Sequence, residues 1–236
     1  MPSSSAAAHR TPAIDVRALS KLHGQTPALL DVTFSALDRE LVVVTGPEGA
    51  GKTTLLKLLA GHMTPSGGRI TIHGIDARMS RLAASAQVGY VPQTLISCGD
   101  MRPGDLLTFS GQARQIAPER LDARLREVIA ECELEPSLDS SCAQLDAPAR
   151  ARVAIAQVLL HDPSVLLLDD VVPVAGQRDA ASLAQLVHGL RRRRTVVVTG
   201  PVSLVDAFPD ARLITLDHGR LTFDSAVPVL GRRHRR

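Results

Sequence analysis

The run GPEGAGKTT, at residues 46–54, carries the clearest chemistry in the sequence because it matches G-x-x-x-x-G-K-[ST] at every fixed position. Glycines let successive backbone N–H groups turn inward around a phosphate, and a helix that begins there adds its positive N-terminal end. Lys52 can reach the terminal phosphates, and the Thr53 hydroxyl can bind a magnesium ion. The sequence therefore predicts a site for a nucleoside triphosphate with Mg²⁺. Its predicted residues are Gly46, Pro47, Glu48, Gly49, Ala50, Gly51, Lys52, Thr53 and Thr54.

The segments on either side of this phosphate loop support the prediction. Residues 41–44 read as a buried strand that ends just before the loop, and residues 55–60 read as a helix just after it. A plain glycine-rich turn between a strand and a helix is the alternative. The order strand, loop, helix is the one that aims a helix N-terminus at a bound phosphate.

Apolar segments along the rest of the chain predict a mixed α/β fold. Strands are predicted at residues 14–19, 29–37, 42–44, 69–74, 88–93, 164–170 and 194–199. The last two are unbroken apolar runs, which are typical of buried parallel strands. Helical periodicity covers residues 104–157 and 178–190, and residues 212–221 read as a hairpin. Residues 1–12 are expected to be a disordered N-terminus.

Composition excludes several classes of protein. A chain of 236 residues is long enough for one α/β domain with a full core. No apolar run approaches the roughly eighteen residues that span a bilayer. Residues 1–12 lack the apolar centre of a signal peptide, so a cytoplasmic protein is expected. Cys98, Cys132 and Cys142 are odd in number and lack metal-ligand spacing, which indicates reduced structural thiols.

The net charge of +3 is modest, and its two basic runs lie at residues 191–194 and 231–236. Such runs can bind nucleic acid or anionic lipid. We interpret the first as a solvated connector before a strand and the second as a frayed terminus. No nucleic-acid partner is expected.

The order of these elements and motifs resembles the ATP-binding cassette of ABC transporters. Besides the phosphate loop, the matching segments are PSGGRITIHG (65–74), VGYVPQ (88–93), RVAIAQVLLHDPSVLLLDD (152–170) and ITLDHGRL (214–221). The resemblance covers about residues 14–230. It implies a single domain over residues 13–236 with a RecA-like P-loop NTPase core and an antiparallel β subdomain. The core would comprise residues 13–95 and 160–236, with a helical subdomain inserted at residues 96–159.

The resemblance implies roles for three more residues. Asp169, at the end of a predicted buried strand, stands where the family's carboxylate holds Mg²⁺ through water, and a hard cation prefers such an oxygen ligand. Gln93 stands where the family's Q-loop glutamine contacts the metal and relays the nucleotide state to a membrane partner. His23 stands where an aromatic side chain stacks on adenine, although imidazole stacks more weakly. A helix-capping aspartate and a surface-loop glutamine are the alternatives for the first two.

One family motif, the L-S-G-G-Q signature before RVAIA, is altered. Its place is taken by Leu145-Asp146-Ala147-Pro148-Ala149. Asp146 brings a negative charge, and Pro148 has no N–H to donate to a γ-phosphate. Asp146 is still a good N-cap, and Pro148 is tolerated in a first helical turn. The helix start is therefore expected to persist without its phosphate contact.

A second segment, SGQAR at residues 110–114, superficially resembles the signature. It lies much farther from Asp169 than Leu145 does, and the shorter spacing is the one that fits the family. Residues 110–114 are therefore predicted to belong to a helix that follows the Q-loop.

Three further departures concern hydrolysis. Asp170 replaces the family's catalytic glutamate, and a general base displaced by about 1 Å can lose on the order of a hundredfold in rate. Residues 171–176 replace the family's D-loop, and Gly200 replaces its switch histidine. Together these departures predict relaxed or redirected catalysis, with Asp170 as the remaining candidate base.

The leading hypothesis is an ATP-binding subunit of an ABC-type transporter that binds Mg-ATP, hydrolyses it weakly or not at all, and couples it to a membrane permease. The expected partners are that permease, docked on the 94–115 segment, and a second cassette in a homodimer or heterodimer. The expected location is the cytoplasmic face of the membrane. A cytosolic ATP-binding regulatory module without a permease, and a fully active ABC ATPase, remain as alternatives.

Overall fold

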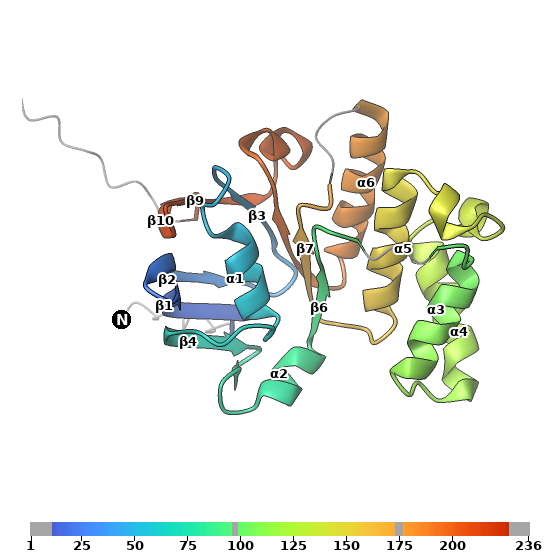
Figure 1. The fold of residues 1–236 in the computed structure, drawn as a ribbon, viewed down its shortest axis with the longest axis horizontal. Coiled ribbons are helices and arrows are strands. Elements are labelled where there is room, and N and C mark those ends of the chain that lie inside the picture. Colours follow the sequence, from blue (N-terminus) through green and yellow to red (C-terminus); the bar gives the residue numbers. More distant parts are fainter. Residues whose placement is uncertain (1–10, 96–98, 173–176, 227–236) are drawn as a thin grey trace, which may run out of the picture.

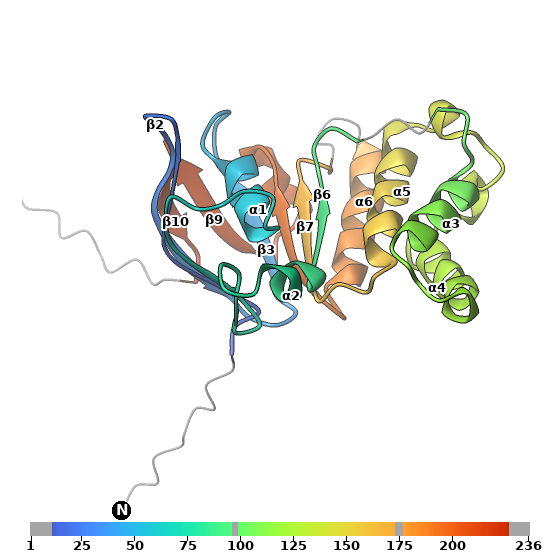
Figure 2. The same ribbon diagram turned by 60° about the horizontal axis from the view of Figure 1, so that its bottom comes forward.

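The computed structural model describes residues 11–95, 99–172 and 177–226, with the backbone alone at residues 177–180. Two sheets and a group of helices make up this part of the chain (Figure 1). Figure 2 shows the layers in order: the first sheet, helix α1, the second sheet, then α6 and α5, and finally α3 and α4. The predictions for residues 1–10, 96–98, 173–176 and 227–236, which include Cys98 and the basic tail, lie outside the described residues.

The first sheet is antiparallel and has the strand order β2-β1-β4-β5. Its strands are β1 (Ile14–His23), β2 (Thr26–Ala36), β4 (Gly67–Ile72) and β5 (Ile75–Asp76). Alternate residues of β1, such as Ile14 and Val16, are fully buried, as a sheet with one covered face requires. This sheet confirms the predicted antiparallel β portion of the fold.

The second sheet has the strand order β10-β9-β3-β8-β7-β6. Its strands are β3 (Leu41–Thr45), β6 (Val88–Val91), β7 (Val165–Asp169), β8 (Thr195–Thr199), β9 (Arg212–Asp217) and β10 (Arg220–Asp224). All neighbouring pairs are parallel except β9 and β10, which form the predicted hairpin. Every residue of β3, β7 and β8 is buried, which explains their unbroken apolar sequences.

Helices cover both faces of the second sheet. The helices are α1 (Lys52–Leu59), α2 (Arg81–Ala86), α3 (Pro103–Ala113), α4 (Pro118–Glu131), α5 (Ala147–Leu159) and α6 (Gln177–Leu190). Val42 and Val44 of β3 belong to the hydrophobic cluster with α1, whereas Val43 belongs to the cluster with α5 and α6. This alternation follows from the period of two in a strand and builds one core on each face of the sheet.

Three short 3₁₀ helices, Glu135–Ser137, Cys142–Gln144 and Val202–Ala207, lie in the connections. No helix of the described ranges is long and apolar enough to cross a membrane. The predicted mixed α/β fold is confirmed, but α2 and β5 were not predicted because such short elements show no periodicity. The division between a core and a helical subdomain at residues 95/96 and 159/160 stays a prediction.

The basic run at residues 191–194 is only partly the solvated connector that its sequence predicts. Arg192 and Arg193 are exposed, but the Arg194 side chain is 1% exposed. Its guanidinium lies 2.6 Å from Oε1 of Glu131, at the end of α4, and 3.4 Å from Oδ1 of Asp162. The interpretation as solvated was therefore wrong for Arg194, whose buried charge is paired with carboxylates.

The two described cysteines, Cys132 and Cys142, are both buried, as structural positions are expected to be, and the reduced state of all three thiols stays a prediction. Burial, with smaller electrostatic contributions from neighbouring charged residues, raises the pKa of Cys132 to about 12. Cys132 therefore stays an uncharged thiol at neutral pH and is a poor nucleophile.

Candidate nucleotide site

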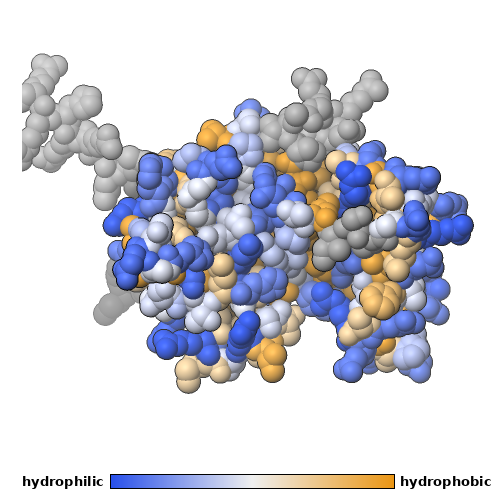
Figure 3. All heavy atoms as spheres, in the orientation of Figure 1, coloured by the Kyte–Doolittle hydropathy of each residue, from blue (hydrophilic) through white to orange (hydrophobic). Residues whose placement is uncertain are grey.

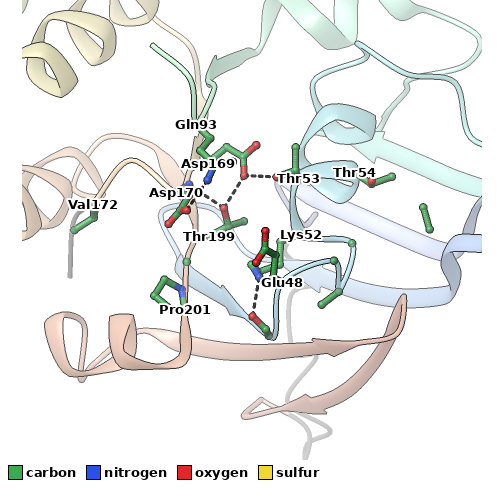
Figure 4. Close-up of a pocket in the computed structure, with 16 residues that line it drawn as sticks. Glu48, Lys52, Thr53, Thr54, Gln93, Asp169, Asp170, Val172, Thr199 and Pro201 are labelled. Carbon is green, nitrogen blue, oxygen red and sulfur yellow. Dashed lines mark hydrogen bonds between the residues drawn. The ribbon is translucent and has the colours of Figure 1, made fainter. Parts of the chain in front are cut away.

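A cavity of about 780 Å³ opens at the carboxyl ends of β3, β7 and β8, which is where open α/β sheets bind ligands (Figure 4). Its volume falls in the range of small-molecule sites. The described residues that line it are Ala28, Gly46, Glu48, Gly49, Ala50, Gly51, Lys52, Thr53, Thr54, Gln93, Asp169, Asp170, Val172, Thr199, Gly200 and Pro201.

Glycine is required at two positions of the phosphate loop. Gly46 has φ 148°, and a Cβ there would lie 2.1 Å from the carbonyl oxygen of Leu216. Gly51 has φ 101°, and a Cβ there would lie 2.5 Å from the carbonyl oxygen of Ala28. Gly51 is also the N-cap of α1, and no side chain of the described residues caps that helix. The first N–H groups of α1 thus face the cavity side of the loop and can bind an anion.

Lys52 lies inside the curve of the loop that it ends. Its Nζ donates to the carbonyl oxygens of Gly46 at 2.7 Å, a contact drawn in Figure 4, and of Pro47 at 2.8 Å. Pro47 itself is not among the lining residues, so its part in the site is this carbonyl contact. The ammonium is therefore placed where the loop would hold phosphate oxygens.

Asp169, at the end of β7, is 1% exposed and accepts three hydrogen bonds. Thr53 and Thr199 donate their hydroxyls to Oδ1 at 3.1 and 2.8 Å, and Tyr90 donates to Oδ2 at 3.0 Å. The ion pairs of the described residues give Asp169 no cationic partner. A buried carboxylate beside a threonine hydroxyl fits a hard cation such as Mg²⁺.

No group of three or more His, Cys, Asp or Glu in the described ranges could hold a metal ion by itself. Mg²⁺ bound with a nucleotide does not need such a group, because that ion takes one or two protein oxygens and completes its shell with phosphates and waters. Thr53 and Asp169 supply those protein oxygens, so these two residues fit the ion.

Asp170 and Gln93 contact one another at the rim of the cavity. The Gln93 amide donates to Oδ2 of Asp170 at 2.9 Å, and the Asp170 N–H donates to Oγ1 of Thr199 at 3.0 Å. Asp170 has φ 52°, a left-handed conformation that aspartate tolerates better than most residues. Both residues line the cavity, and a metal contact by Gln93 and general-base activity of Asp170 remain predictions.

Sequence reasoning missed two residues of the site. Thr199, at the end of β8, bonds to Asp169 through its hydroxyl and to the Asp170 N–H. Tyr90, in β6, bonds to the other oxygen of Asp169. The signal for Thr199 was a polar residue at the end of a buried apolar strand, and the signal for Tyr90 was its place three residues before Gln93.

His23 does not reach the cavity. It ends β1, is exposed, and pairs with Thr26 across the hairpin. Ala28 of the neighbouring strand β2 lines the cavity instead, and His23 is not among its described lining residues. Stacking of His23 on adenine remains a prediction.

The structure describes most of the segments that the sequence analysis interprets as altered motifs, whose effect on catalysis stays a prediction. Asp146 caps α5 by accepting from the Ala149 N–H at 2.8 Å, which confirms the predicted N-cap, with proline in the first turn. Residues 110–113 lie in α3 rather than at the start of α5, as predicted. Gly200 lines the cavity, and a Cβ there would lie 2.7 Å from Cδ2 of Leu204. Of the D-loop segment, Val171 and Val172 are buried.

The sequence matches known proteins along most of its length. The family described as ABC transporter matches residues 29–172. The sulfate/thiosulfate import ATP-binding protein CysA of Synechococcus elongatus is 30% identical over 211 residues, which cover 88% of this chain and 61% of that protein. The phosphonates import ATP-binding protein PhnC of Anaeromyxobacter dehalogenans is 31% identical over 233 residues, covering 93% of this chain and 46% of that protein.

Solved structures share the fold. The structure of cbiO1 from Clostridium perfringens superposes with a TM-score of 0.78 at 23% identity, covering 91% of this chain and 88% of that one. The dimeric ATP-binding cassette MJ0796, bound to ADP and Pi, superposes with a TM-score of 0.75 at 21% identity, covering 89% and 97%. The chain spans between 41% and 61% of the length of the curated relatives that it matches. With the phosphate loop, Asp169 and this fold in place, the chain belongs to the ABC transporter family of ATP-binding cassettes.

Proposed function

We propose that this chain is the ATP-binding subunit of an ABC-type transporter, which binds Mg-ATP and couples that binding to a membrane permease. The observation that carries the proposal is one cavity that joins the glycine loop, Lys52, Thr53 and Asp169. The names of relatives support it, since CysA, PhnC and TauB are described as import ATP-binding proteins. The subunit would then lie on the cytoplasmic face of the membrane.

The residues of the cavity divide the work of binding. The N–H groups at the start of α1 would donate to phosphate oxygens, and Lys52 would exchange its carbonyl contacts for the terminal phosphates. Thr53, at the start of α1, and Asp169, at the end of β7, would hold the cation. When bound, Mg²⁺ neutralises phosphate charge. A second cassette, in a homodimer or heterodimer, would cover the open side, and the dimeric description of MJ0796 supports that arrangement.

Weak or absent hydrolysis is part of the proposal. One oxygen of Asp170 already accepts a hydrogen bond from Gln93, and the Asp146 carboxylate accepts one from the first turn of α5. Gly200 has no side chain to contact a γ-phosphate. Each missing donor to a developing charge removes on the order of 3 kcal/mol of transition-state stabilisation. Pairing with an intact cassette would leave one altered component in each composite site, so the subunit would hold ATP more readily than turn it over.

Docking on a permease would use the 94–115 segment. Two large apolar side chains there are exposed, Met101 by 41% and Phe109 by 62%, and Phe109 lies on α3. The face of the molecule in Figure 3 is mostly hydrophilic, with separate apolar areas over the helices. Aromatic and methionine side chains are enriched in protein interfaces relative to the rest of the surface.

The test is binding of a fluorescent ATP analogue in the presence of Mg²⁺. Wild-type protein is expected to bind it, and Lys52→Ala is expected to lose binding by at least a hundredfold, because a charged phosphate contact is removed. Lys57→Ala, later in the same helix α1, is the matched control and is expected to bind like wild type. A wild-type protein that shows no binding at millimolar analogue would overturn the proposal.

A further inference from the structure

The two oxygens of the Asp169 carboxylate have different partners. Oδ1 accepts from the Thr53 and Thr199 hydroxyls, at 3.1 and 2.8 Å, and Oδ2 accepts from the Tyr90 hydroxyl at 3.0 Å. The terminal torsion of an aspartate is broad, so one set of partners on one oxygen does not fix the plane of the carboxylate. Donors on both oxygens do fix it.

Tyr90 is itself held from two sides. It stands in β6 opposite Leu167 of β7, two residues before Asp169, and is partly buried against the hydrophobic cluster of α1. The Tyr90 and His62 rings form a T-shaped pair, with centroids 5.1 Å apart and planes at 90°. His62 follows the end of α1, whose first residues are Lys52 and Thr53. The Tyr90 ring therefore packs beside the phosphate-loop helix, while its hydroxyl contacts Asp169.

The protonation of the phenol suits a donor. A tyrosine phenol ordinarily loses its proton only at about pH 10. At neutral pH the phenol is uncharged and can only donate its one proton to Oδ2. It offers the carboxylate no competing cation.

We propose that Tyr90 is a positioning residue for the magnesium site: its hydroxyl holds Oδ2 of Asp169 and so keeps Oδ1 beside the Thr53 hydroxyl. This inference rests on the proposed binding of Mg-ATP. A ring that served packing alone would work equally well without its oxygen. Partners that orient a metal ligand typically change metal affinity by about 10- to 100-fold when removed.

The first experiment separates the hydroxyl from the ring. Tyr90→Phe removes only the oxygen, and His62→Ala removes only the ring contact. For each purified variant, binding of the fluorescent ATP analogue is titrated with Mg²⁺ and repeated in EDTA. Tyr90→Phe is expected to need about tenfold more Mg²⁺ for half-maximal binding and to match wild type in EDTA. For His62→Ala, both the Mg²⁺ requirement and the binding in EDTA are expected to stay within about twofold of wild type. The inference is overturned if Tyr90→Phe needs the same Mg²⁺ concentration as wild type. It is also overturned if Tyr90→Phe loses as much affinity for the analogue in EDTA as it does with Mg²⁺.

The second experiment requires no nucleotide. The chain has one tyrosine and no tryptophan, so its tyrosine emission reports Tyr90 alone. A carboxylate that accepts a hydrogen bond from a phenol quenches its emission, and Asp169→Asn is therefore expected to increase the emission of the folded protein. His62→Ala serves as the control for a changed ring environment. Unchanged emission in Asp169→Asn shows that the contact is absent and overturns the inference.

The two experiments also distinguish this inference from the proposed function. If emission rises in Asp169→Asn but wild-type protein binds no Mg-ATP, the proposed function is overturned, and with it a role of Tyr90 in metal binding. Wild-type protein that binds Mg-ATP while Tyr90→Phe has an unchanged Mg²⁺ requirement overturns this inference alone. Thermal unfolding of each variant checks that its fold is intact.

Discussion

The side-chain amide of Gln93 donates a hydrogen bond of 2.9 Å to Oδ2 of Asp170. Gln93 follows β6 and Asp170 follows β7, so the contact joins the ends of two neighbouring strands at the rim of the cavity. One oxygen of the remaining candidate base is therefore already engaged. A water molecule that Asp170 is to activate must displace the amide or use the other oxygen.

Hydrolysis is expected to be slow for this reason and because Gly200 and Asp146 supply no donor to a γ-phosphate. Steady-state phosphate release by the purified protein is expected to stay below about 1 s⁻¹ per subunit, the lower end of ordinary enzyme turnover. Lys52→Ala measures the contribution of contaminating enzymes. A faster rate that disappears in this variant would show that the altered motifs still support catalysis and that the chain is a fully active ATPase.

Co-purification with a membrane permease is expected to depend on the surface around α3. Arg102 precedes this helix as its N-cap residue and is exposed. Arg102→Glu is expected to weaken recovery with the membrane fraction on coexpression with the permease, since it reverses a charge in the docking segment. Arg126→Glu, on the exposed side of α4, is the matched charge reversal outside the segment and is expected to have no effect. Equal recovery of both variants would contradict the docking assignment, and recovery of the wild type without membrane would favour the regulatory module.

Arg194 is expected to matter for stability more than its neighbours in the basic run. Arg194→Met leaves the Glu131 carboxylate, which is 21% exposed, without its 2.6 Å partner. Because the Glu131 carboxylate keeps some contact with solvent, the expected loss is about 1–3 kcal/mol, as for a partly buried acceptor left without its donor. Arg192→Met changes an exposed side chain and is expected to stay within about 0.5 kcal/mol. Urea unfolding followed by circular dichroism measures both, and similar values for the two variants would argue against a buried pair.

The pair of Arg212 and Asp224 predicts an acid-sensitive part of the stability. Burial opposes the charge of Asp224, but hydrogen bonds from Arg212 and from the Ala226 N–H outweigh it, so the pKa of Asp224 lies below its ordinary value. Since the folded protein binds this proton more weakly than the unfolded chain, the pair stabilises fully above about pH 4 and less as the pH falls through the lowered pKa.

This expectation is checked with Asp224→Asn. The difference in unfolding free energy between wild type and variant is expected to be constant from about pH 7 to pH 5 and to shrink below about pH 4. Arg212→Met is expected to lose the same pH-dependent part, because it removes the donor at 2.6 Å. If this difference in unfolding free energy grows on acidification, or shrinks toward alkaline pH, the lowered pKa of Asp224 is contradicted.

Local patterns predicted the parts of the fold and site that depend on neighbours in sequence. The phosphate loop, its strand and its helix are contiguous, and the Asp146 N-cap bonds to a residue three positions away. The partners of Tyr90 and Arg194 could not be predicted in this way. Tyr90 bonds to Asp169 across 79 residues, and Arg194 bonds to Glu131 across 63. Sequence periodicity indicates which face of an element is buried, but not which distant side chain it will meet there.

The two strands that carry the phosphate loop and Asp169 are separated by one other strand of the sheet. In the second sheet β8 lies between β3, which leads to the phosphate loop, and β7, which ends at Asp169. Neighbouring strands are about 4.8 Å apart, so the loop and the carboxylate approach the ligand from strands about 10 Å apart. The end of β8, Thr199 followed by Gly200, lies between them and lines the cavity. A strand without a phosphate-binding motif therefore sets the width of the nucleotide site, and larger residues at its end would narrow that site without touching the loop.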